Sequence, residues 1–347
     1  MPQLKRIGVI GLGRMGSQHC RVYSGLRRAQ LVGVCDSNPE IGNRIAQRFE
    51  VPFYASVDEL LDHVDAVSLV TPTPYHFEVA MHCIERGIHV MIEKPITETE
   101  EQAMTLVNAA ENSGLVVQVG HIERFNPAYV ELKNVLEDVN VLAVNFRRLS
   151  VYSGSNTDVD VVLDLMIHDT DLVMDLACDE PDLISATGIH VYSSEIDYAS
   201  AQLRFPAGPL MTLTASRVTE EKVRSIEVTA MEAYIEASLL NKTVTLHHRT
   251  SGQYLNNNTR GVKYRQEGVV ESILVPVVEP LYSELQSFVD CVVEGKAPLV
   301  TPLAGLKALR LALQIRNACR ANLLTAIPRH SFSQPCLVPV PSSISQQ

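Results

Sequence analysis

The first candidates for chemistry lie in the stretch "VVLDLMIHDTDLVMDLA", residues 161–177. Asp164, His168, Asp171 and Asp175 are spaced by four, three and four residues, so on an α-helix they form one polar line in a mostly apolar run. Ionisable groups on a largely buried helix are costly unless they are paired or face a cleft. The stripe therefore predicts a site, and by itself it allows a metal ligand, a catalytic base or a buried paired network.

A second candidate lies near the start of the chain, where "IGVIGLGRMG" contains G-x-G-x-x-G at Gly11, Gly13 and Gly16. The pattern ends an apolar strand and begins a helix, the context in which such a turn binds a dinucleotide. Gly11 would allow the tight turn, Gly13 the approach of the pyrophosphate, and Gly16 close packing of helix and strand. The N–H groups at the helix start would bind the phosphates. Glycines that make only a tight turn are the alternative.

Asp36 ends the second predicted strand 20 residues after Gly16. A carboxylate at this place can accept hydrogen bonds from the ribose hydroxyls of NAD and repels the 2′-phosphate of NADP. The sequence therefore predicts NAD as the cofactor.

Two different patterns of secondary structure must position these residues. The first 120 residues alternate short apolar runs with helical patterns, which predicts β-α-β units and a parallel sheet covered on both faces. After about residue 140, alternating strands follow one another with short turns, which predicts an antiparallel sheet with one covered face. The helix at 161–177 interrupts this series, and two more helices are expected around 281–295 and 305–319.

Composition limits the classes of protein. The 347 residues suffice for two domains with cores, and a net charge of −11 argues against nucleic acid or an anionic membrane surface as a partner. No apolar run approaches the ~20 residues that span a bilayer, and no secretory signal is visible. The seven cysteines are scattered without CxxC pairs, so a disulfide framework or zinc ribbon is not expected. These features favour a cytoplasmic protein.

Three short motifs, "TPTPYH" at 71–76, "IEKPIT" at 92–97 and "LDLMIHD" at 163–169, resemble the glucose–fructose oxidoreductase / inositol dehydrogenase (Gfo/Idh/MocA) family. The resemblance extends over nearly the whole chain, to "ELQSFVDCVVEGKAPLVTPLAGLKAL". It implies an α/β protein with an N-terminal Rossmann domain, here 1–122, and a C-terminal α/β domain with a large, mostly antiparallel, open-faced sheet, here 123–330. The Pro- and Ser-rich residues 331–347 are expected to be a loose tail.

The same resemblance implies an NAD-dependent dehydrogenase acting on a CH–OH group. In the family's E-K-P signature the lysine lies beside the reacting carbon and the nicotinamide, which corresponds to Lys94; its charge would favour the developing alkoxide. The D-x-x-x-H motif corresponds to Asp164 and His168. The histidine takes the hydroxyl proton, and the aspartate binds the substrate or orients the histidine. Met166 stands where glycine is common, which would narrow the site.

The remaining cofactor contacts follow from the same motifs. In "TPTPYH", Thr73 replaces the family's usual asparagine, and His76 would lie near the cofactor or, alternatively, bind backbone at a helix start. Cofactor binding is predicted at Gly11, Gly13, Arg14, Met15, Gly16, Asp36, Thr71, Pro72, His76, Glu93 and Lys94. No metal is expected, because His168 and Asp169 have no obvious companion histidines.

The substrate prediction rests on "GHIERFNP" at 120–127, which resembles the UDP-N-acetylglucosamine 3-dehydrogenase branch of the family. Lys222 and Arg224 are candidates to anchor a diphosphate or the cofactor, although exposed strand charges are usually just solvated; Arg147 and Arg148 are weaker candidates. Substrate binding is predicted at His121, Glu123, Arg124, Asn126, Asp164, Lys222 and Arg224. The expected reaction is NAD-dependent oxidation of the 3-hydroxyl of a UDP-linked amino sugar.

Two other functions remain open at this point: a dehydrogenase of a free polyol or monosaccharide, and a non-catalytic NAD-binding sensor. Intact Lys94, Asp164 and His168 argue against the sensor. Asp171 and Asp175 are expected to be structural, by capping or by pairing with nearby arginine, and Asp169 has no assigned role. The resemblance also implies a homo-oligomer, a dimer or tetramer, formed through the C-terminal sheet.

Overall fold

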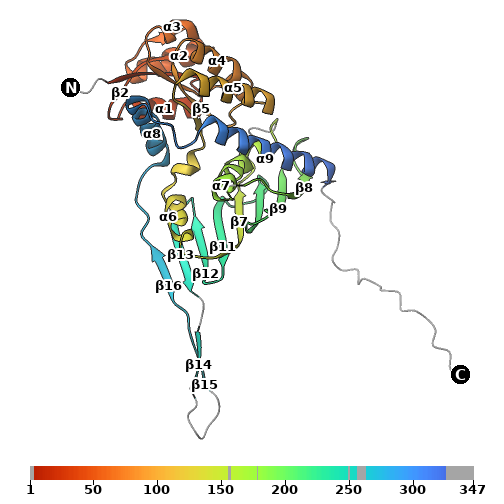
Figure 1. The fold of residues 1–347 in the computed structure, drawn as a ribbon. Helices are drawn as coiled ribbons and strands as arrows, with labels where there is room; N and C mark the ends of the chain where they lie inside the picture. The colour runs from red at the N-terminus through yellow and green to blue at the C-terminus, as the bar shows by residue number, and fades with distance from the viewer. Residues whose placement is uncertain (1–3, 155–157, 178, 249–250, 256–262, 326–347) are drawn as a thin grey trace, which may run out of the picture.

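The computed structural model describes residues 4–154, 158–177, 179–248, 251–255 and 263–325 (Figure 1). The tail predicted at 331–347 lies outside these residues. Figure 1 shows a smaller α/β part at the top, a broad sheet below it, and the long helix α9 lying across the sheet beneath the upper part. Within the described ranges, no helix combines the length and apolarity needed to cross a membrane.

The upper part is the predicted parallel sheet, with strand order β3-β2-β1-β4-β5-β6 and parallel pairing throughout. Its apolar strands are β1 (Lys5–Ile10), β2 (Ala29–Cys35), β3 (Phe53–Tyr54), β4 (Ala66–Leu69), β5 (His89–Glu93) and β6 (Val117–Gly120). The connecting helices are α1 (Arg14–Tyr23), α2 (Pro39–Phe49), α3 (Val57–Leu61), η1 (Thr73–Tyr75), α4 (His76–Glu85) and α5 (Glu100–Ser113). This topology places the carboxyl ends of the strands along one edge, where ligands of such sheets bind.

The lower part confirms the predicted mostly antiparallel sheet, with strand order β16-β13-β12-β11-β7-β10-β9-β8-β17. Two pairs, β10 with β7 and β17 with β8, are parallel. The strands are β7 (Val141–Leu149), β8 (Leu183–His190), β9 (Tyr198–Arg204), β10 (Leu210–Ser216), β11 (Val223–Ala230), β12 (Ala233–Ser238), β13 (Thr243–His248), β16 (Val270–Ile273) and β17 (Leu323–Thr325). A separate hairpin joins β14 (Ser251–Leu255) to β15 (Lys263–Glu267).

Helices connect and cover the two sheets. α7 (Ile167–Ala177) and α9 (Pro302–Ala321) pack against each other, and α9 also contacts β8 and α5. α8 (Pro280–Glu294) returns to pack on α1. The helices expected around 281–295 and 305–319 are thus confirmed. The sequence analysis did not predict α6 (Pro127–Leu136), although Asn126 caps its start and Pro127 takes its first position, a standard signal for a helix start.

The helix predicted at 161–177 is not a regular α-helix. Its first turn, Val162–Met166, is π-helical, with the Ile167 N–H bonded to the Val162 carbonyl, and α7 follows it directly. One extra residue in a turn shifts the side chains before it around the helix axis relative to those after it. Asp164 and His168 are therefore not stacked as the regular spacing predicted.

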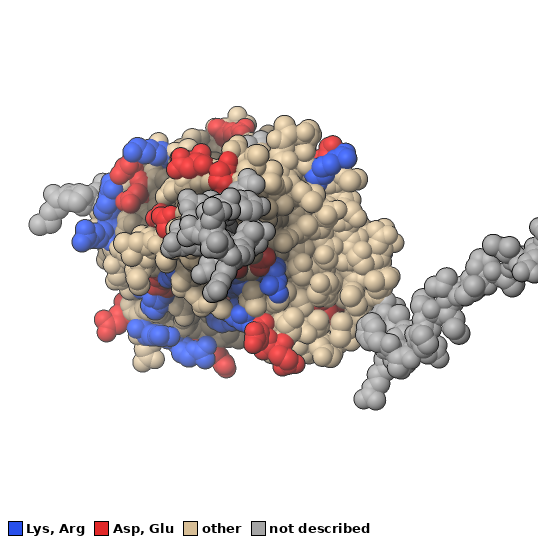
Figure 2. Space-filling view, turned by 90° about the horizontal axis from the view of Figure 1, so that it is seen from below, with Lys and Arg blue, Asp and Glu red and all other residues tan. Residues whose placement is uncertain are grey.

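The face of the large sheet that turns away from α7 carries mostly polar side chains. Residues with exposed or half-exposed side chains alternate there with core residues; they include Ser200, Gln202, Thr212, Thr214, Tyr234 and Glu236. Figure 2 shows the molecule from below, with Lys, Arg, Asp and Glu gathered on one side of the view and few of them on the other. Arg147 belongs to this outer face, where it pairs with Glu227 at 3.7 Å.

Candidate active site

The glycine turn has the geometry that a dinucleotide needs. Gly11 has a φ of +89°, and a Cβ there would lie 2.7 Å from the backbone of Val70 and Thr71. A Cβ on Gly16 would lie 1.9 Å from the Gly11 carbonyl oxygen, so helix and turn touch. Gly13, in contrast, faces open space with nothing within 4 Å of a Cβ position. The backbone at Gly13 is therefore accessible to a phosphate group at the start of α1.

Asp36 lies at the end of β2 beside this turn. Its Oδ2 accepts a hydrogen bond from the Leu12 N–H at 2.6 Å, and its Oδ1 accepts one from the Asn38 N–H at 2.8 Å. These two bonds fix the carboxylate toward a cavity of about 910 Å³. The cavity is lined by Gly11, Gly13, Arg14, Met15, Asp36, Thr71 and Pro72, together with apolar residues such as Ile41 and Val79. A glycine cradle and a ribose-binding carboxylate in one cavity fit NAD.

The structure places His76 away from this cavity, buried between two loops. Its Nδ1 lies 2.8 Å from the carbonyl oxygen of Pro95, and its Nε2 lies 2.8 Å from the carbonyl oxygen of Thr71. Of the two interpretations of this histidine, the geometry matches the one in which it binds backbone. His76 therefore links the "TPTP" loop to the loop that carries Lys94.

Lys94 extends from the end of β5 toward the start of the π-helical turn. Its Nζ donates a hydrogen bond to the backbone carbonyl of Asp164 at 2.8 Å and lies 3.9 Å from the carboxylate oxygen Oδ1 of that residue. Burial lowers the pKa of Lys94, while the charges of Asp164 and Glu93 raise it. Glu93 itself points inward, with one oxygen 3.1 Å from His19 Nε2 and the other bonded to the Lys94 N–H.

His168, in the first turn of α7, is half-buried beside Lys94. Its Nδ1 is buried and has no hydrogen-bond partner in the described part of the chain, so Nε2 is the nitrogen left to meet a substrate. Burial, followed by the positive charges of Lys94 and Arg148, lowers the pKa of His168 well below its usual value. A neutral imidazole beside a lysine is the form that a general base needs.

Arg148 is a fully buried arginine beneath His168. Its Nε donates to both carboxylate oxygens of Asp169 at 3.0 Å, Nη2 donates to Asp169 Oδ1 at 2.7 Å, and Nη1 donates to Glu123 Oε1 at 2.8 Å. Burial lowers the pKa of Arg148, but the two carboxylates outweigh burial and raise it. The weaker interpretation of Arg147 and Arg148 as diphosphate anchors is therefore wrong: neighbouring strand residues point to opposite faces, and neither reaches the cleft.

Several predicted substrate residues bind other protein groups. Glu123 accepts from Arg148 and from Arg224, whose Nη1 lies 3.5 Å away, and its second oxygen accepts from Asn126. Asn126 also donates to the Leu239 carbonyl and caps α6. Arg124 lies 3.6 Å from Asp171 and pairs with Asp175. Both aspartates thus lie within ion-pair distance of an arginine, as expected, but Asp171 Oδ2 accepts no hydrogen bond from it in the described chain.

Three cations from both domains gather near the cleft. Lys222 is exposed and Arg224 is half-buried, and Arg14 lines the cofactor cavity. The charge of Arg224 is the largest influence that lowers the pKa of Lys222; burial, Arg14 and Arg148 lower it further, while Glu123 raises it. Cations that influence one another in this way create a positive potential that favours a bound anion.

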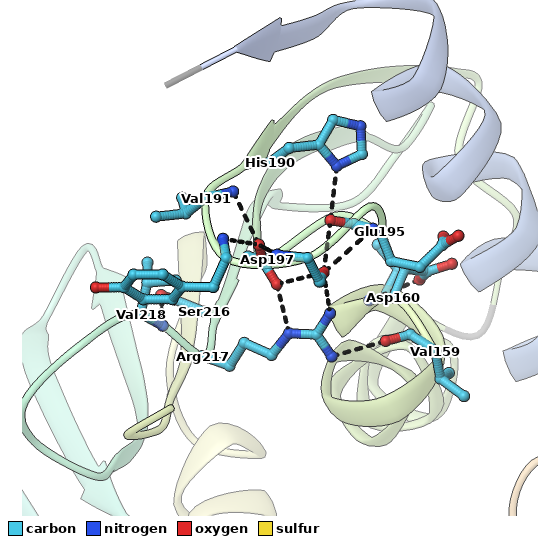
Figure 3. Close-up of polar contacts among 12 residues, drawn as sticks. Val159, Asp160, His190, Val191, Glu195, Asp197, Ser216, Arg217 and Val218 are labelled. Carbon is cyan, nitrogen blue, oxygen red and sulfur yellow. Dashed lines mark hydrogen bonds and ion pairs between the residues drawn. The ribbon is translucent and has the colours of Figure 1, made fainter. Parts of the chain in front are cut away.

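A second arginine cluster holds the segment that leads into the π-helical turn (Figure 3). Arg217 Nε donates to Asp197 at 2.7 Å and Nη1 donates to the Val159 carbonyl at 2.7 Å. The next residue, Asp160, accepts from the Val162 and Leu163 N–H groups at 3.0 Å each. The turn that carries Asp164 is therefore fixed at its start from β10.

The fold and this site agree with known protein families. Residues 5–121 match the model of the oxidoreductase family with an NAD-binding Rossmann fold, and residues 149–236 match the GFO/IDH/MocA C-terminal domain. The chain belongs to this family and is an NAD-dependent dehydrogenase of the sugar-oxidising type.

Two relatives cover almost the whole chain. The UDP-N-acetylglucosamine 3-dehydrogenase of Acidithiobacillus ferrooxidans is 33% identical over 318 residues, 92% of this chain and 98% of that protein. Its solved structure aligns with a TM-score of 0.83 at 32% identity, over 92% of this chain and 99% of that one. The scyllo-inositol 2-dehydrogenase (NAD(+)) of Bacillus subtilis is 25% identical over 92% of this chain and 95% of that protein.

The sequence analysis missed two groups around the site. It did not pair Arg148 with Asp169, because the partners lie 21 residues apart on a strand and a helix. It also missed Glu284 on α8, a fully buried residue whose two carboxylate oxygens have no hydrogen-bond partner among the described residues. Burial, followed by the charge of Glu93, raises the pKa of Glu284 well above its usual value. A glutamate in an otherwise apolar helix stripe was the available signal.

Proposed function

We propose that this dehydrogenase oxidises the 3-hydroxyl of a UDP-linked amino sugar, converting UDP-GlcNAc to UDP-3-keto-GlcNAc. The observation that carries the proposal is the group of cations Arg14, Lys222 and Arg224 beside the cleft. In a chain of net charge −11, such a group is a specific local feature and suits a diphosphate. The similarity to the Acidithiobacillus enzyme over 92% of the chain supports the same substrate.

The proposed catalytic residues divide the reaction between them. NAD, held by Asp36 and the glycine turn, would supply the hydride acceptor for the substrate carbon. His168 Nε2 takes the hydroxyl proton, and Lys94 stabilises the negative charge that develops on the oxygen. Asp164 holds Lys94 through its backbone carbonyl, which leaves its carboxylate to bind the substrate or orient His168. Asp36 binds the ribose, and the turn at Gly13 binds the pyrophosphate.

The substrate is tested by incubating the purified protein with NAD and UDP-GlcNAc and following reduced nicotinamide by absorbance. The parallel reactions contain N-acetylglucosamine or myo-inositol. Lys222→Gln and Arg224→Gln are each expected to raise KM for UDP-GlcNAc about tenfold, the effect of losing a charge-assisted bond. Lys296→Gln, at a surface lysine paired with Glu294, is the matched control and should leave KM unchanged.

The alternative within the same class is a dehydrogenase of a free polyol or monosaccharide, which the inositol dehydrogenase relative supports. Turnover with myo-inositol or a free sugar, and none with UDP-GlcNAc, would establish it in place of our proposal. A non-catalytic NAD-binding sensor has the least support, since it needs neither Lys94 nor His168 in the cleft. Such a sensor would bind NAD without reducing it in the presence of any of these alcohols.

We also propose a cytoplasmic homo-oligomer, a dimer or tetramer assembled through the outer face of the large sheet. The small polar side chains of that face, such as Ser200 and Thr212, allow close approach of a second sheet. Light scattering after size-exclusion chromatography measures the mass directly. A monomeric mass at micromolar concentration would contradict the oligomer without affecting the proposed reaction.

A further inference from the structure

His121, at the carboxyl end of β6, is a buried histidine with unusual surroundings. It is 1% exposed, and neither Nδ1 nor Nε2 has a hydrogen-bond partner in the described ranges. An imidazole always carries at least one N–H donor, and burying it without a partner is costly. Buried polar groups are nearly always bonded, and exceptions concentrate where a group has a catalytic task.

Two more buried atoms around His121 share this property. They are His168 Nδ1 and Asp171 Oδ2, and Arg124 beside Asp171 has buried nitrogens without a hydrogen bond as well. His168 and Asp171 are three residues apart on α7, so they lie on the same side of the helix. Asp171 is 2% exposed, and its nearest cation, Arg124 Nε, lies 3.6 Å away without a hydrogen bond.

The electrostatic couplings connect the same three residues. Burial lowers the pKa of His121 and the carboxylate of Asp171 raises it; Arg124 and Lys94 lower it, and Glu93 raises it. Burial is the main cause that lowers the pKa of His168, followed by the positive charges of Lys94, Arg148, His121 and Arg224. Burial raises the pKa of Asp171, while His121, Arg124 and Lys133 lower it. The backbone agrees with these couplings: His121 follows Gly120, which pairs with Glu93 next to Lys94, and the carbonyl of His121 accepts from the N–H of Arg124, which contacts Asp171.

Asp171 opens onto a groove separate from the cofactor cavity. The groove has a volume of about 320 Å³, and Arg124, Asp175, Leu303 and Lys307 line it with Asp171. None of its lining residues in the described chain also lines the cofactor cavity. A proton that reaches Asp171 can therefore leave without crossing the substrate cleft.

We propose that His168, His121 and Asp171 form an exit path for the proton that alcohol oxidation releases. The proposal rests on the dehydrogenase activity and not on the identity of the sugar. The C–H bond breaks and its electron pair moves as hydride to NAD; the O–H bond breaks and its proton binds His168 Nε2. His168 then gives its Nδ1 proton to His121, and His121 gives a proton to Asp171, which releases it to water in the groove. The net products are ketone, NADH and one proton.

Such a path lets the proton leave His168 through its buried nitrogen. With the substrate hydroxyl at Nε2, the buried Nδ1 is the other nitrogen through which His168 can lose a proton. The three groups form no direct hydrogen bonds with one another, so each transfer uses rotation of a ring or one bridging water.

The test compares the release of protons with the transfer of hydride. The wild-type protein, His121→Gln, Asp171→Asn and the control Asp175→Asn are mixed rapidly with NAD and UDP-GlcNAc in weak buffer containing a pH indicator. Asp175 lies one turn beyond Asp171, lines the same groove and also pairs with Arg124, but it is held by Tyr129 and Lys133 and is not part of the path. Reduced nicotinamide and indicator colour are recorded together during the first turnover.

Proton release should keep pace with hydride transfer in the wild type and in Asp175→Asn. In His121→Gln and Asp171→Asn, the rate of proton release should be at least about tenfold lower than the rate of hydride transfer. Asp171→Glu, which restores a carboxylate, should recover most of the rate. Simultaneous release in both path variants would overturn the proposal.

The experiment distinguishes a wrong sugar substrate from a wrong proton path. If the wild type reduces NAD with myo-inositol and not with UDP-GlcNAc, the same recording is made with myo-inositol. Proton NMR titration of His121 gives a second readout, which needs neither turnover nor the His121→Gln variant. Because the Asp171 carboxylate raises the pKa of His121, this pKa should fall in Asp171→Asn and stay unchanged in Asp175→Asn. An unchanged pKa in Asp171→Asn would also overturn the path.

Discussion

Asp169 and Asp171 are two residues apart on α7 and equally buried, yet their carboxylates meet opposite surroundings. Asp169 is held by three hydrogen bonds from Arg148, which also holds Glu123. Asp171 Oδ2 has no hydrogen bond and faces a histidine that has none either, as far as the structure is described. Two positions on a helix are roughly 200° apart, so one aspartate turns toward the sheet and the other toward β6.

The buried charges on the two sides of His168 thus have different roles, one structural and one in proton transfer. The Arg148 cluster is fully bonded, and it joins β7, α7 and the segment after β6 into one rigid frame. His121 and Asp171 keep polar atoms without fixed partners, so these atoms are free to form the transient hydrogen bonds along which a proton moves. His168 lies between them and depends on both.

The largest effect is expected at this shared residue. His168→Ala removes the general base, and kcat should fall by about 10²–10⁴-fold. The Kd for NAD, measured by fluorescence titration, should stay within about threefold, because the change is worth less than one charge-assisted bond at the cofactor. Lys94→Ala should behave in the same way. Loss of NAD binding along with turnover would show that both residues serve the cofactor site rather than the chemistry.

The comparison itself is tested by removing one partner from each cluster. Arg148→Met removes the hydrogen bonds that hold the buried carboxylate of Asp169 and one of those that hold Glu123, and it should lower the free energy of unfolding by about 3–5 kcal/mol in urea titration. Asp171→Asn removes a carboxylate whose pKa is raised by burial. A raised pKa in the folded state disfavours the charged form, so wild-type stability falls relative to Asp171→Asn as pH rises through that pKa. If both variants lost the same free energy of unfolding at neutral pH, the two buried clusters would not differ in the way described.

A smaller effect concerns the pH dependence of the reaction. His168 must be neutral to act, and its lowered pKa keeps it neutral down to lower pH than an ordinary histidine. We expect kcat/KM to rise with pH through a pKa below about 6.5 and then to level off. Arg148→Met removes a positive charge that opposes protonation, so this limb should move to higher pH. A shift to lower pH would contradict the assignment of His168 as the base.

The smallest effect is expected at an exposed ion pair and serves as calibration. Arg204 Nη2 lies 2.9 Å from Asp182 on the surface of β9, a distance close to that between Arg148 and Asp169. Arg204→Met should leave the free energy of unfolding nearly unchanged, because water screens an exposed pair. A loss as large as that of Arg148→Met would mean that burial is not what distinguishes the two arginines.

The sequence predicted the cofactor half of the molecule well. The glycine turn and Asp36 are close together in the chain, and local rules fix their geometry: a strand, a tight turn and a helix start. The alternating pattern likewise indicated the second sheet, although not the order of its strands, which depends on pairings distant in sequence.

The substrate half was harder to predict, for physical reasons. The motif "HIERFN" suggested ligand contacts. In the structure, Glu123 is bonded to Arg148 and Arg224, and Asn126 caps α6. These partners come from separate strands, and no local pattern encodes such pairing. The regular helix expected at 161–177 was likewise wrong in its first turn, because no residue type marks a π-helical turn and the contacts with Lys94 arise in the folded chain.

The most direct test of the proposed reaction uses UDP-GlcNAc carrying deuterium at C3 of the sugar. Wild-type protein is incubated with this substrate and NAD, and the reduced nicotinamide is analysed by mass spectrometry. Our account predicts that the nicotinamide gains the deuterium and that kcat/KM is lower than with the unlabelled sugar when hydride transfer limits it. Reduced nicotinamide without deuterium would show that another carbon is oxidised and would contradict the account.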